Sequence, residues 1–501
     1  MTNPLATLKA RLAEICDLRH AGAVLLWDRQ VNMPPGGSMA RAEQTATLRK
    51  MAHEMFVANE TGRLLDSAAT AAAKLDPDSD DARMVRVAQR DYGKARKLPV
   101  ELVAEMARVT GQAVDMWTMA RKNNDWPAFE PWLEKIVDLN RRQADALGYT
   151  GRMYDALLDQ YEPDMTFAQV ESVFNAVKPV LIELTKAAAA HADKTSDAVL
   201  FREYDETGQL QFAREVIRQF GFDFERGRQD KSVHPFSTGF SIHDVRITTR
   251  VNRNFLSSAL FGMMHECGHA LYRQGIAPAF ERTFLANVVS LGLHESQSRL
   301  WENLVGRGRA FWKHYFPELQ KRFPEALAGQ TAESIYCAVN RVHPSFNRVE
   351  ADEVTYGLHI MFRFELENEM LERKIKIHEV PEAWAAKMAS FLGVTPPTVR
   401  EGALQDIHWA MGSFGYFPTY LLGNLIASQL WEKIETDIPG IEGPIERGEF
   451  SGLLGWLGKN LHRHGRKFTT QELLQRITGR GLDAAPYLAY LRRKYRDLYG
   501  F

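Results

Sequence analysis

Residues 237–274 read STGFSIHDVRITTRVNRNFLSSALFGMMHECGHALYRQ, and two different sequence patterns meet there. The first part, 237–251, is rich in β-branched residues and lacks helical periodicity, which favours strand. The second part has the apolar spacing of a helix, with Asn252 or Asn254 as the candidate N-cap and Gly275 just beyond its end. The stretch therefore predicts a short strand or hairpin beside a helix that carries two histidines.

Most of the remaining chain has helical periodicity. Leu5, Leu8 and Leu12 recur at three- and four-residue steps. Short breaks at residues 76–80 and 162–164 contain Asp and Pro, which favours turns between helices over domain linkers. The predicted fold class is mainly all-α, with the small β region next to the histidine-bearing helix.

Composition and charge exclude several classes of protein. The chain has 501 residues, 45% of them hydrophobic, and its 62 Lys+Arg against 63 Asp+Glu give a net charge of −1. This balance argues against a basic nucleic-acid binder, and the apolar content argues against disorder. Three cysteines are few and odd in number, so we expect no disulfide framework and a reducing compartment. The N-terminus lacks a signal-like apolar stretch and no run of about 18 apolar residues occurs, so a cytoplasmic protein without a membrane partner is expected.

The sequence His-Glu-Cys-Gly-His at residues 265–269 is a candidate metal site. Residues four apart share one face of a helix, so His265 and His269 can both direct an imidazole nitrogen at one cation. Glu266 can approach the open coordination position without binding the cation, as a general base requires. Two core histidines and a paired Glu are the ordinary alternative, but the apolar helical context favours zinc.

A catalytic zinc needs a third protein ligand. Residues 288–307 predict a second amphipathic helix, on which His294 and Glu295 are both candidates. We choose Glu295 as the ligand. On periodicity alone, however, an ion pair between Glu295 and Arg299 explains that side chain at least as well.

The sequence also resembles a known family over essentially its whole length. The motifs that carry the resemblance are, in order, His234-Pro235-Phe236, Asp244-x-Arg246-x-Thr248, His265-Glu266-x-x-His269, His294-Glu295-Ser296-Gln297, Arg348-x-x-Ala351-Asp352 and Gly402-x-x-Gln405-Asp406-x-His408-Trp409. In this pattern the chain is similar to the carboxypeptidase Taq family, the thermostable-type zinc metallocarboxypeptidases. One departure is Asn347, where the family usually has Ile or Val, and it bears on local packing and substrate preference.

The resemblance implies one domain over residues 1–501, an almost all-helical ellipsoid with a long deep cleft and a small sheet, similar to neurolysin and angiotensin-converting enzyme. Residues 1–230 would form a helical wall of the cleft, 231–253 the small β region, and 254–501 the zinc- and substrate-binding helices. The resemblance also implies a homodimer, and Glu295 as the third ligand. It implies zinc, with cobalt as a possible substitute, and release of single C-terminal residues with broad preference and poor action at proline.

Roles in catalysis follow from these motifs. Glu266 would take a proton from the attacking water, which the cation activates, and pass it to the leaving amine. Tyr420 and His408 are the candidates that would stabilise the oxyanion, and Tyr416 is a further candidate that could also contact the substrate. The alternative for each tyrosine is an ordinary packed ring with a satisfied hydroxyl group.

An exopeptidase must also recognise the free α-carboxylate of its peptide. Arginine suits this task because it is always charged and can bind a carboxylate through two hydrogen bonds. Arg348 is the leading candidate and Arg246 the second, although Arg246 can instead pair with Asp244 on the same strand face. His234, which precedes a proline, is predicted to line the cleft or to brace the β region.

Residues around the ligands are expected to support them. Asp406 or Asp352 is a candidate to accept a hydrogen bond from a metal-binding imidazole. Cys267 lies inside the motif but on another face of the helix, so a buried thiol is expected rather than a ligand.

The leading interpretation is a zinc metallocarboxypeptidase that acts on peptides with a free C-terminus. An oligopeptide endopeptidase or a dipeptidyl carboxypeptidase on the same scaffold is the main competitor. A catalytically silent metal-binding protein is the third interpretation, and Glu266 argues against it because a structural metal site has no need of that carboxylate. No nucleic-acid or membrane partner is expected.

Overall fold

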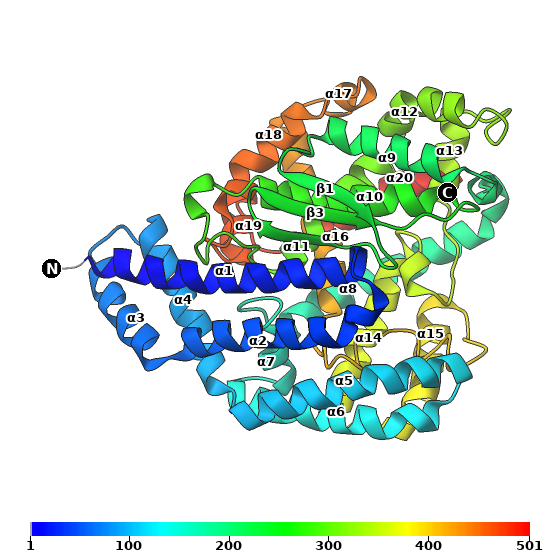
Figure 1. Cartoon of the computed structure of the whole chain (residues 1–501). Coiled ribbons are helices and arrows are strands. Elements are labelled where there is room, and N and C mark those ends of the chain that lie inside the picture. The colour runs from blue at the N-terminus through cyan, green and yellow to red at the C-terminus, as the bar shows by residue number, and fades with distance from the viewer. Residues whose placement is uncertain (1–2) are drawn as a thin grey trace.

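The β-branched stretch before the histidine-bearing helix folds into a small sheet of three strands (Figure 1). β2 (Ser237–Ser241) and β3 (Asp244–Thr249) form the predicted antiparallel hairpin. β1 (Gly227–Lys231) pairs in parallel with the other edge of β3, which gives the order β1-β3-β2. β1 was not predicted, because its residues GRQDK are polar and lack the alternation of a half-buried strand.

The central strand connects the sheet to the helix behind it. Ile247 of β3 lies opposite Ser237 of β2 and opposite Gln229 of β1. Val245 and Ile247 are fully buried, and β3 packs against α10. The apolar face of the hairpin is therefore covered by the helix that carries the histidine motif.

The computed structural model describes residues 3–501, and most of these residues lie in α-helices. In chain order the α-helices are α1 (Pro4–Val31), α2 (Ser38–Val57), α3 (Asn59–Ala72), α4 (Asp80–Lys97), α5 (Val100–Asn123), α6 (Trp126–Leu147), α7 (Met153–Leu158), α8 (Phe167–Ala190), α9 (Glu206–Phe220), α10 (Leu256–Gln274), α11 (Leu291–Arg299), α12 (Arg309–Arg322), α13 (Ala332–Val339), α14 (Thr355–Leu371), α15 (Val380–Leu392), α16 (Pro418–Asp437), α17 (Glu442–Glu446), α18 (Ser451–Asn460), α19 (Thr470–Thr478) and α20 (Ala485–Tyr499).

α10 ends where the sequence predicts but begins later. Its last residue, Gln274, is followed by Gly275 at the C-cap. The prediction for its start was wrong, because the helix begins at Leu256 and has no side-chain cap. The side chain of Asn252 instead accepts a hydrogen bond from the backbone N–H of Asn254 at 2.9 Å, which closes a turn ahead of the helix.

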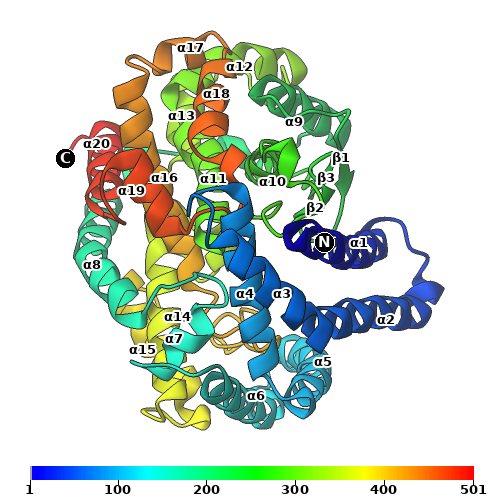
Figure 2. The ribbon, with the colours of Figure 1, turned by 90° about the vertical axis from the view of Figure 1, so that its left-hand side faces the viewer.

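α10, α11 and α16 lie together in the middle of the molecule (Figure 2). The expected helix at 288–307 is present in two parts, α11 and the π-helical segment η5 (Leu300–Gly306). π-helical turns are rare and occur often at functional sites. Figure 2 shows α9, α12, α13 and α17 on one side of this central layer and α5, α6, α14 and α15 on the other.

The N-terminal helices are joined to the sheet through α1. Trp27 of α1 packs edge-on against Phe240 of β2, with ring centroids 6.4 Å apart. A separate apolar core links α1, α3 and α4 with the segment that contains Ile276 and Leu285. The largest core runs through most of the remaining helices.

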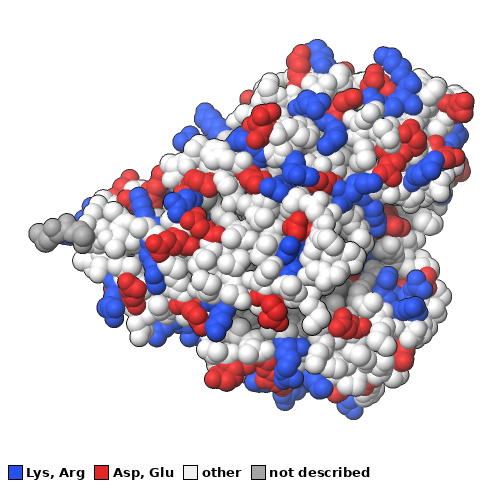
Figure 3. Space-filling model, in the orientation of Figure 1, with Lys and Arg blue, Asp and Glu red and all other residues white. Residues whose placement is uncertain are grey.

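The surface carries charges of both signs. On the face seen in Figure 3, Lys and Arg side chains are interspersed with Asp and Glu side chains. This distribution agrees with the net charge of −1. Of the helices in residues 3–501, none is both long enough and apolar enough to cross a membrane.

Candidate metal centre

His265 and His269 lie one turn apart on α10, and their Nε2 atoms face Glu295 of α11. The distance from Nε2 to Glu295 Oε2 is 3.5 Å for His265 and 3.4 Å for His269. One donor atom from each of the three side chains lies within 4.8 Å of the other two. The three residues predicted as ligands are therefore brought together around one point.

The close approach of α10 and α11 depends on Gly268, inside the motif. A Cβ atom at this position would lie 2.7 Å from the Cα atom of Ser298, far inside ordinary contact distance. The two helix backbones therefore touch next to His269, which allows Glu295 to reach the imidazoles. Cys267 is fully buried, and burial raises the pKa of its thiol, as expected for a packed cysteine.

Hydrogen bonds on the far nitrogens orient both imidazoles. His265 Nδ1 lies 2.8 Å from Glu302 Oε2, and His269 Nδ1 lies 3.0 Å from the carbonyl oxygen of His294. Because both partners are acceptors, each Nδ1 carries the hydrogen and donates it. In the neutral imidazole that a metal requires, each Nε2 then presents its lone pair to the centre.

These acceptors correct the prediction for the residues behind the ligands. Asp406 is bound by two arginines instead. Asp352 accepts hydrogen bonds from the backbone N–H of Thr355 at 3.0 Å and from its hydroxyl group at 2.6 Å, which fixes the start of α14. Neither carboxylate is the acceptor for a histidine of the ligand cluster, because Glu302 and the His294 carbonyl group take that place.

The two oxygens of Glu295 have different partners. Oε1 accepts a hydrogen bond from Arg299 Nε at 2.8 Å, whereas Oε2 faces the two imidazoles. The hydroxyl group of Ser298 also donates to Oε2, at 3.1 Å. The ion pair with Arg299 and the position among the ligands are therefore both present, and the two explanations of Glu295 do not exclude each other.

The surroundings of the two imidazoles differ, because burial lowers the pKa of His269 whereas neighbouring carboxylates favour positive charge on His265. Burial opposes the charged form of His265, but Glu295 and Glu302 outweigh it and raise the pKa of His265 to about 10. Burial also raises the pKa of Glu266, to about 7. Two imidazole nitrogens and one carboxylate oxygen in such a field fit a divalent cation, and zinc prefers this donor set.

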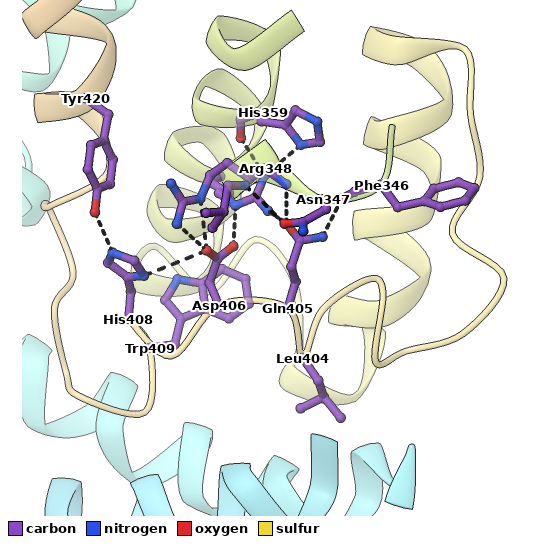
Figure 4. A network of polar contacts seen from close by, with 12 residues as sticks. Phe346, Asn347, Arg348, His359, Leu404, Gln405, Asp406, His408, Trp409 and Tyr420 are labelled. Carbon is purple, nitrogen blue, oxygen red and sulfur yellow. Dashed lines mark hydrogen bonds and ion pairs between the residues drawn. The ribbon is translucent and has the colours of Figure 1, made fainter. Parts of the chain in front are cut away.

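A second buried network surrounds Asp406 (Figure 4). Arg348 donates from Nε and Nη2 to Asp406 Oδ1 at 2.9 and 2.8 Å, and Arg363 Nε donates to Oδ2 at 2.7 Å. The side-chain oxygen of Gln405 accepts from Arg363 Nη2 and from the backbone N–H of Arg348, both at 2.8 Å. Within the described chain, Arg348 Nη1 retains one long contact of 3.4 Å, to the hydroxyl group of Tyr356. Two guanidinium groups thus share one carboxylate.

His408 and Tyr420 extend this network (Figure 4). His408 Nε2 lies 3.0 Å from the Tyr420 hydroxyl group, and its Nδ1 lies 3.8 Å from Asp406 Oδ1. The rings of Tyr416 and Tyr420 are 5.3 Å apart. Burial raises the pKa of both tyrosines, and the nearby Glu295 carboxylate raises it further. Three residues predicted for catalysis or substrate binding therefore lie near the ligand cluster.

Arg246 and His234 are not part of either group. Arg246 donates to both carboxylate oxygens of Asp244, at 2.8 and 2.9 Å, and its guanidinium lies 4.3 Å from the ring centre of Trp27. This geometry favours the ion-pair explanation for Arg246. His234 is exposed, and its carbonyl oxygen accepts a hydrogen bond from the Ser232 hydroxyl group at 2.6 Å. The substrate-binding roles of Arg246 and His234 stay predictions.

The chain also matches known proteins over nearly its whole length. The family model described as carboxypeptidase Taq (M32) metallopeptidase matches residues 7–495. The chain belongs to this family. Thermostable carboxypeptidase 1 of Thermus thermophilus is 40% identical over 496 residues, and carboxypeptidase 1 of Bacillus subtilis is 35% identical over 489 residues, with 97% of each chain covered in both cases. The crystal structure of the M32 carboxypeptidase from Deinococcus radiodurans R1 has 43% identity and a TM-score of 0.97, and the match covers 100% of both chains.

Membership of the M32 family establishes the class of reaction. The matched relatives are named as carboxypeptidases, so this chain is a peptide-bond hydrolase of the carboxypeptidase class. The family consists of metallopeptidases, which implies a metal ion. His265, His269 and Glu295 offer a suitable set of ligand atoms for it.

Two buried residues of this M32 site were missed in the sequence analysis, Glu302 and Arg363. A signal was available for Glu302, because Glu295, Arg299 and Glu302 follow at i, i+4 and i+7 and so share one helix face. Arg363 lies between two phenylalanines in an otherwise apolar run, which indicates a buried charge that needs a partner. Neither signal identifies the partner. Arg363 binds Asp406 and Glu302 binds His265, and both partners are far away in the sequence.

Proposed function

We propose that this protein is a zinc-dependent metallocarboxypeptidase that releases single residues from the C-terminus of peptides, with broad preference and poor action at proline. The observation that carries this proposal is the place of Glu266 beside the His265, His269 and Glu295 donor set. Glu266 is buried next to the first histidine and is not itself one of the converging donors. It is therefore available to move a proton at the reacting centre.

A bound zinc ion would supply Lewis acidity, which lowers the pKa of a water molecule and polarises the scissile carbonyl group. Glu266 takes a proton from the attacking water and delivers it to the leaving amine. The Tyr420 hydroxyl group, held by His408 Nε2, donates a hydrogen bond to the carbonyl oxygen as negative charge develops there. Tyr416 packs beside Tyr420 and contacts the substrate.

Arg348 is proposed to bind the free α-carboxylate of the peptide. Its bond to Asp406 fixes the guanidinium group, and Arg363 shares the same carboxylate, so one positive charge is left to attract an anion. Nη1 of Arg348 has hydrogens to donate beyond its long contact with Tyr356. Arg246 and His234 are retained as secondary substrate-binding candidates.

The deciding experiment compares a peptide with a free C-terminus and the same peptide with an amidated C-terminus, and identifies the products by mass. Sequential loss of single residues from the free peptide, with little turnover of the amide, supports the proposal. Equal turnover of both peptides would favour an oligopeptide endopeptidase, and release of dipeptides would favour a dipeptidyl carboxypeptidase. The absence of any cleavage by the metal-loaded protein would favour a catalytically silent metal-binding protein.

The choice of metal has its own test. Chelator treatment should abolish turnover, and addition of zinc to the metal-free protein should restore it, with cobalt as a substitute. Glu295→Gln should weaken binding of either metal, because it removes the one charged ligand of the donor set. Retention of zinc by this variant with unchanged affinity would contradict the ligand assignment.

The proposal includes several broader expectations. We propose a homodimer, which light scattering tests directly, since a single-chain mass would contradict it. We also propose a cytoplasmic location, no nucleic-acid or membrane partner, and a scaffold with a deep cleft similar to those of neurolysin and angiotensin-converting enzyme. The division of the single domain at residues 1–230, 231–253 and 254–501 is proposed with them.

A further inference from the structure

Glu162 is a buried carboxyl group with no part in the proposed reaction. It lies in the connector between α7 and α8, in the Glu-Pro-Asp break that the sequence analysis interprets as a turn between helices. Only 1% of its surface is exposed. Burial of a carboxyl group is costly unless its oxygens have hydrogen-bond donors, so the partners of Glu162 indicate why it is there.

Those partners belong to the first turn of α11, the helix that carries Glu295. The backbone N–H of Gly292 donates to Glu162 Oε1. The N–H of Leu291 donates to the carbonyl oxygen of Tyr161 at 3.0 Å, and the N–H of Leu293 donates to the Ser290 hydroxyl group at 3.0 Å. The first-turn N–H groups of a helix have no partner inside the helix, and here the connector supplies two of the three acceptors.

The contact between Glu162 and α11 leaves no room for a side chain at Gly292. A Cβ atom at this position would lie 2.9 Å from Glu162 Oε1 and 3.1 Å from its carboxyl carbon. The carboxyl group is therefore in direct contact with the backbone of the helix. A displacement of Glu162 would therefore either move the first turn of α11 or leave the Gly292 N–H without its acceptor.

We propose that Glu162 is a positioning residue for the metal centre, which holds the N-terminus of α11 and so sets the place of Glu295. α11 has only nine residues before it changes to the π-helical segment η5. Glu295 lies about one turn after the anchored residues, so a displacement of the first turn would also displace Glu295. The inference rests on the proposed function, because it requires Glu295 to be a metal ligand.

The same connector also supports the other side of the site. The ring of Tyr161 packs edge-on against the ring of Tyr416, with centroids 5.2 Å apart. Tyr416 in turn packs beside Tyr420. Residues 161–162 therefore contact both the ligand-bearing helix and the first ring of the tyrosine pair.

The carboxyl group acts here as a hydrogen-bond acceptor and does not need to be charged. Burial raises the pKa of Glu162 to about 8, against the opposing hydrogen bonds from Gly292 and Ser290. An uncharged carboxyl group still accepts the Gly292 N–H, and so does the side-chain amide of glutamine. Glu162→Gln should therefore rescue what Glu162→Ala loses.

The experiment measures cobalt binding by chelator competition, the visible spectrum of the cobalt-loaded protein, and hydrogen exchange of α11 amides without metal. Glu162→Ala should lower cobalt affinity by about 10- to 100-fold, change the cobalt spectrum and speed exchange in α11. Glu162→Gln should stay within about threefold of the unaltered protein. Asp125→Ala is the matched control, because Asp125 caps α6 by accepting from the Ala128 N–H at 3.2 Å and should leave all three readouts unchanged.

Cobalt affinity, spectrum and α11 exchange that are unchanged in Glu162→Ala would overturn the inference. If Glu162→Ala fails to fold, Gly292→Ala supplies the same test from the other side of the contact, since its new methyl group displaces the carboxyl group. Unchanged cobalt binding in Glu295→Gln is a distinct result, which would overturn the proposed ligand set and this inference with it.

Discussion

The metal centre and the Asp406 network are both buried groups of charges, but they are built differently. Carboxylates face the imidazoles in the first, whereas guanidinium groups outnumber the carboxylate in the second. At the metal centre, Glu295 and Glu302 surround the imidazoles, and the pKa of His265 is raised to about 10 as a result, against the effect of burial. In the other network, the guanidinium groups of Arg348 and Arg363 share the single carboxylate of Asp406. In the proposed function, the first group would hold a cation and the second would bind the α-carboxylate of the peptide.

This difference indicates how one protein can place two unlike ligands near each other. A buried charge is tolerated only if it is paired. The Asp406 network has two guanidinium groups for one carboxylate, whereas Glu295 and Glu302 each face both an imidazole and Arg299. His408 and Tyr420 lie between the clusters. His408 contacts both Asp406 and Tyr420, and the nearby Glu295 carboxylate raises the pKa of Tyr420.

The largest expected effect tests the proton transfer at the metal centre. Glu266→Gln keeps the shape of the side chain but cannot accept a proton, so kcat should fall by about 10² to 10⁴-fold. Metal content, measured on the same preparation, should stay unchanged because Glu266 is not one of the converging donors. A variant that keeps both its metal and its turnover would remove Glu266 from the mechanism.

The next effect tests the charge pairing around Asp406. Asp406→Asn leaves two buried guanidinium groups without their carboxylate, which should cost about 3 to 5 kcal/mol of unfolding free energy in denaturant titrations. Burial alone would raise the pKa of Asp406, but Arg348 and Arg363 outweigh it and hold the pKa well below its ordinary value of 3.8.

The pH dependence of this effect follows from the sign of the shift. Because the folded protein favours the ionised form, Asp406 contributes its full stabilisation above pH ~4 and loses it as the pH falls further. The stability difference between the unaltered protein and Asp406→Asn should be constant near neutral pH and shrink in acid. A difference that grows in acid would contradict the pairing.

A smaller effect separates recognition from structure within the arginine pair. Arg348→Lys should lower kcat/KM for free peptides by roughly 10- to 100-fold, since hydrogen bonds between charged groups contribute about 1.5 to 3 kcal/mol. Arg363→Lys is the matched control, because Arg363 binds the same carboxylate but is fully buried, and it donates hydrogen bonds to Asp406 and Gln405. Equal kinetic losses in both variants would mean that Arg348 is structural only.

The smallest effect tests the orientation of one imidazole. Glu302→Gln keeps an acceptor near His265 Nδ1 but removes the charge, so zinc affinity should fall by about tenfold in chelator competition. Glu353→Gln is a suitable control, because Glu353 is also a buried carboxylate, paired with Lys494 at 2.7 Å instead of with a histidine. A larger loss of zinc in the control would contradict a specific role for Glu302.

The sequence allows prediction of those parts of the site that depend on spacing along one helix. His265, Glu266 and His269 are set by helical periodicity, and the apolar residues around them place their helix in the core. The hairpin before this helix was also predictable, since β-branched residues mark it. Glu295 required the resemblance, because its spacing from Arg299 fits an ion pair equally well.

The remainder depends on contacts between segments far apart in the chain. Asp406 binds Arg348 and Arg363, and Glu302 accepts a hydrogen bond from His265. These contacts follow from how α14, η5 and the segment before α16 pack together. Glu162 looks like part of an ordinary turn in the sequence and is buried only because α11 lies over it. β1 is recruited by pairing with β3, and its polar residues carry no pattern of their own.

The pairing of Arg299 with one oxygen of Glu295 has a consequence for which ions the site accepts. With Oε1 held by the guanidinium group, the carboxylate has a single oxygen to offer to an ion. Calcium, which collects six to eight oxygen atoms and often takes both from one carboxylate, gains little from such a donor. Zinc needs only four ligands in all, so it loses nothing. In the proposed zinc site, Arg299 would therefore contribute to discrimination between the two ions although it is not a ligand.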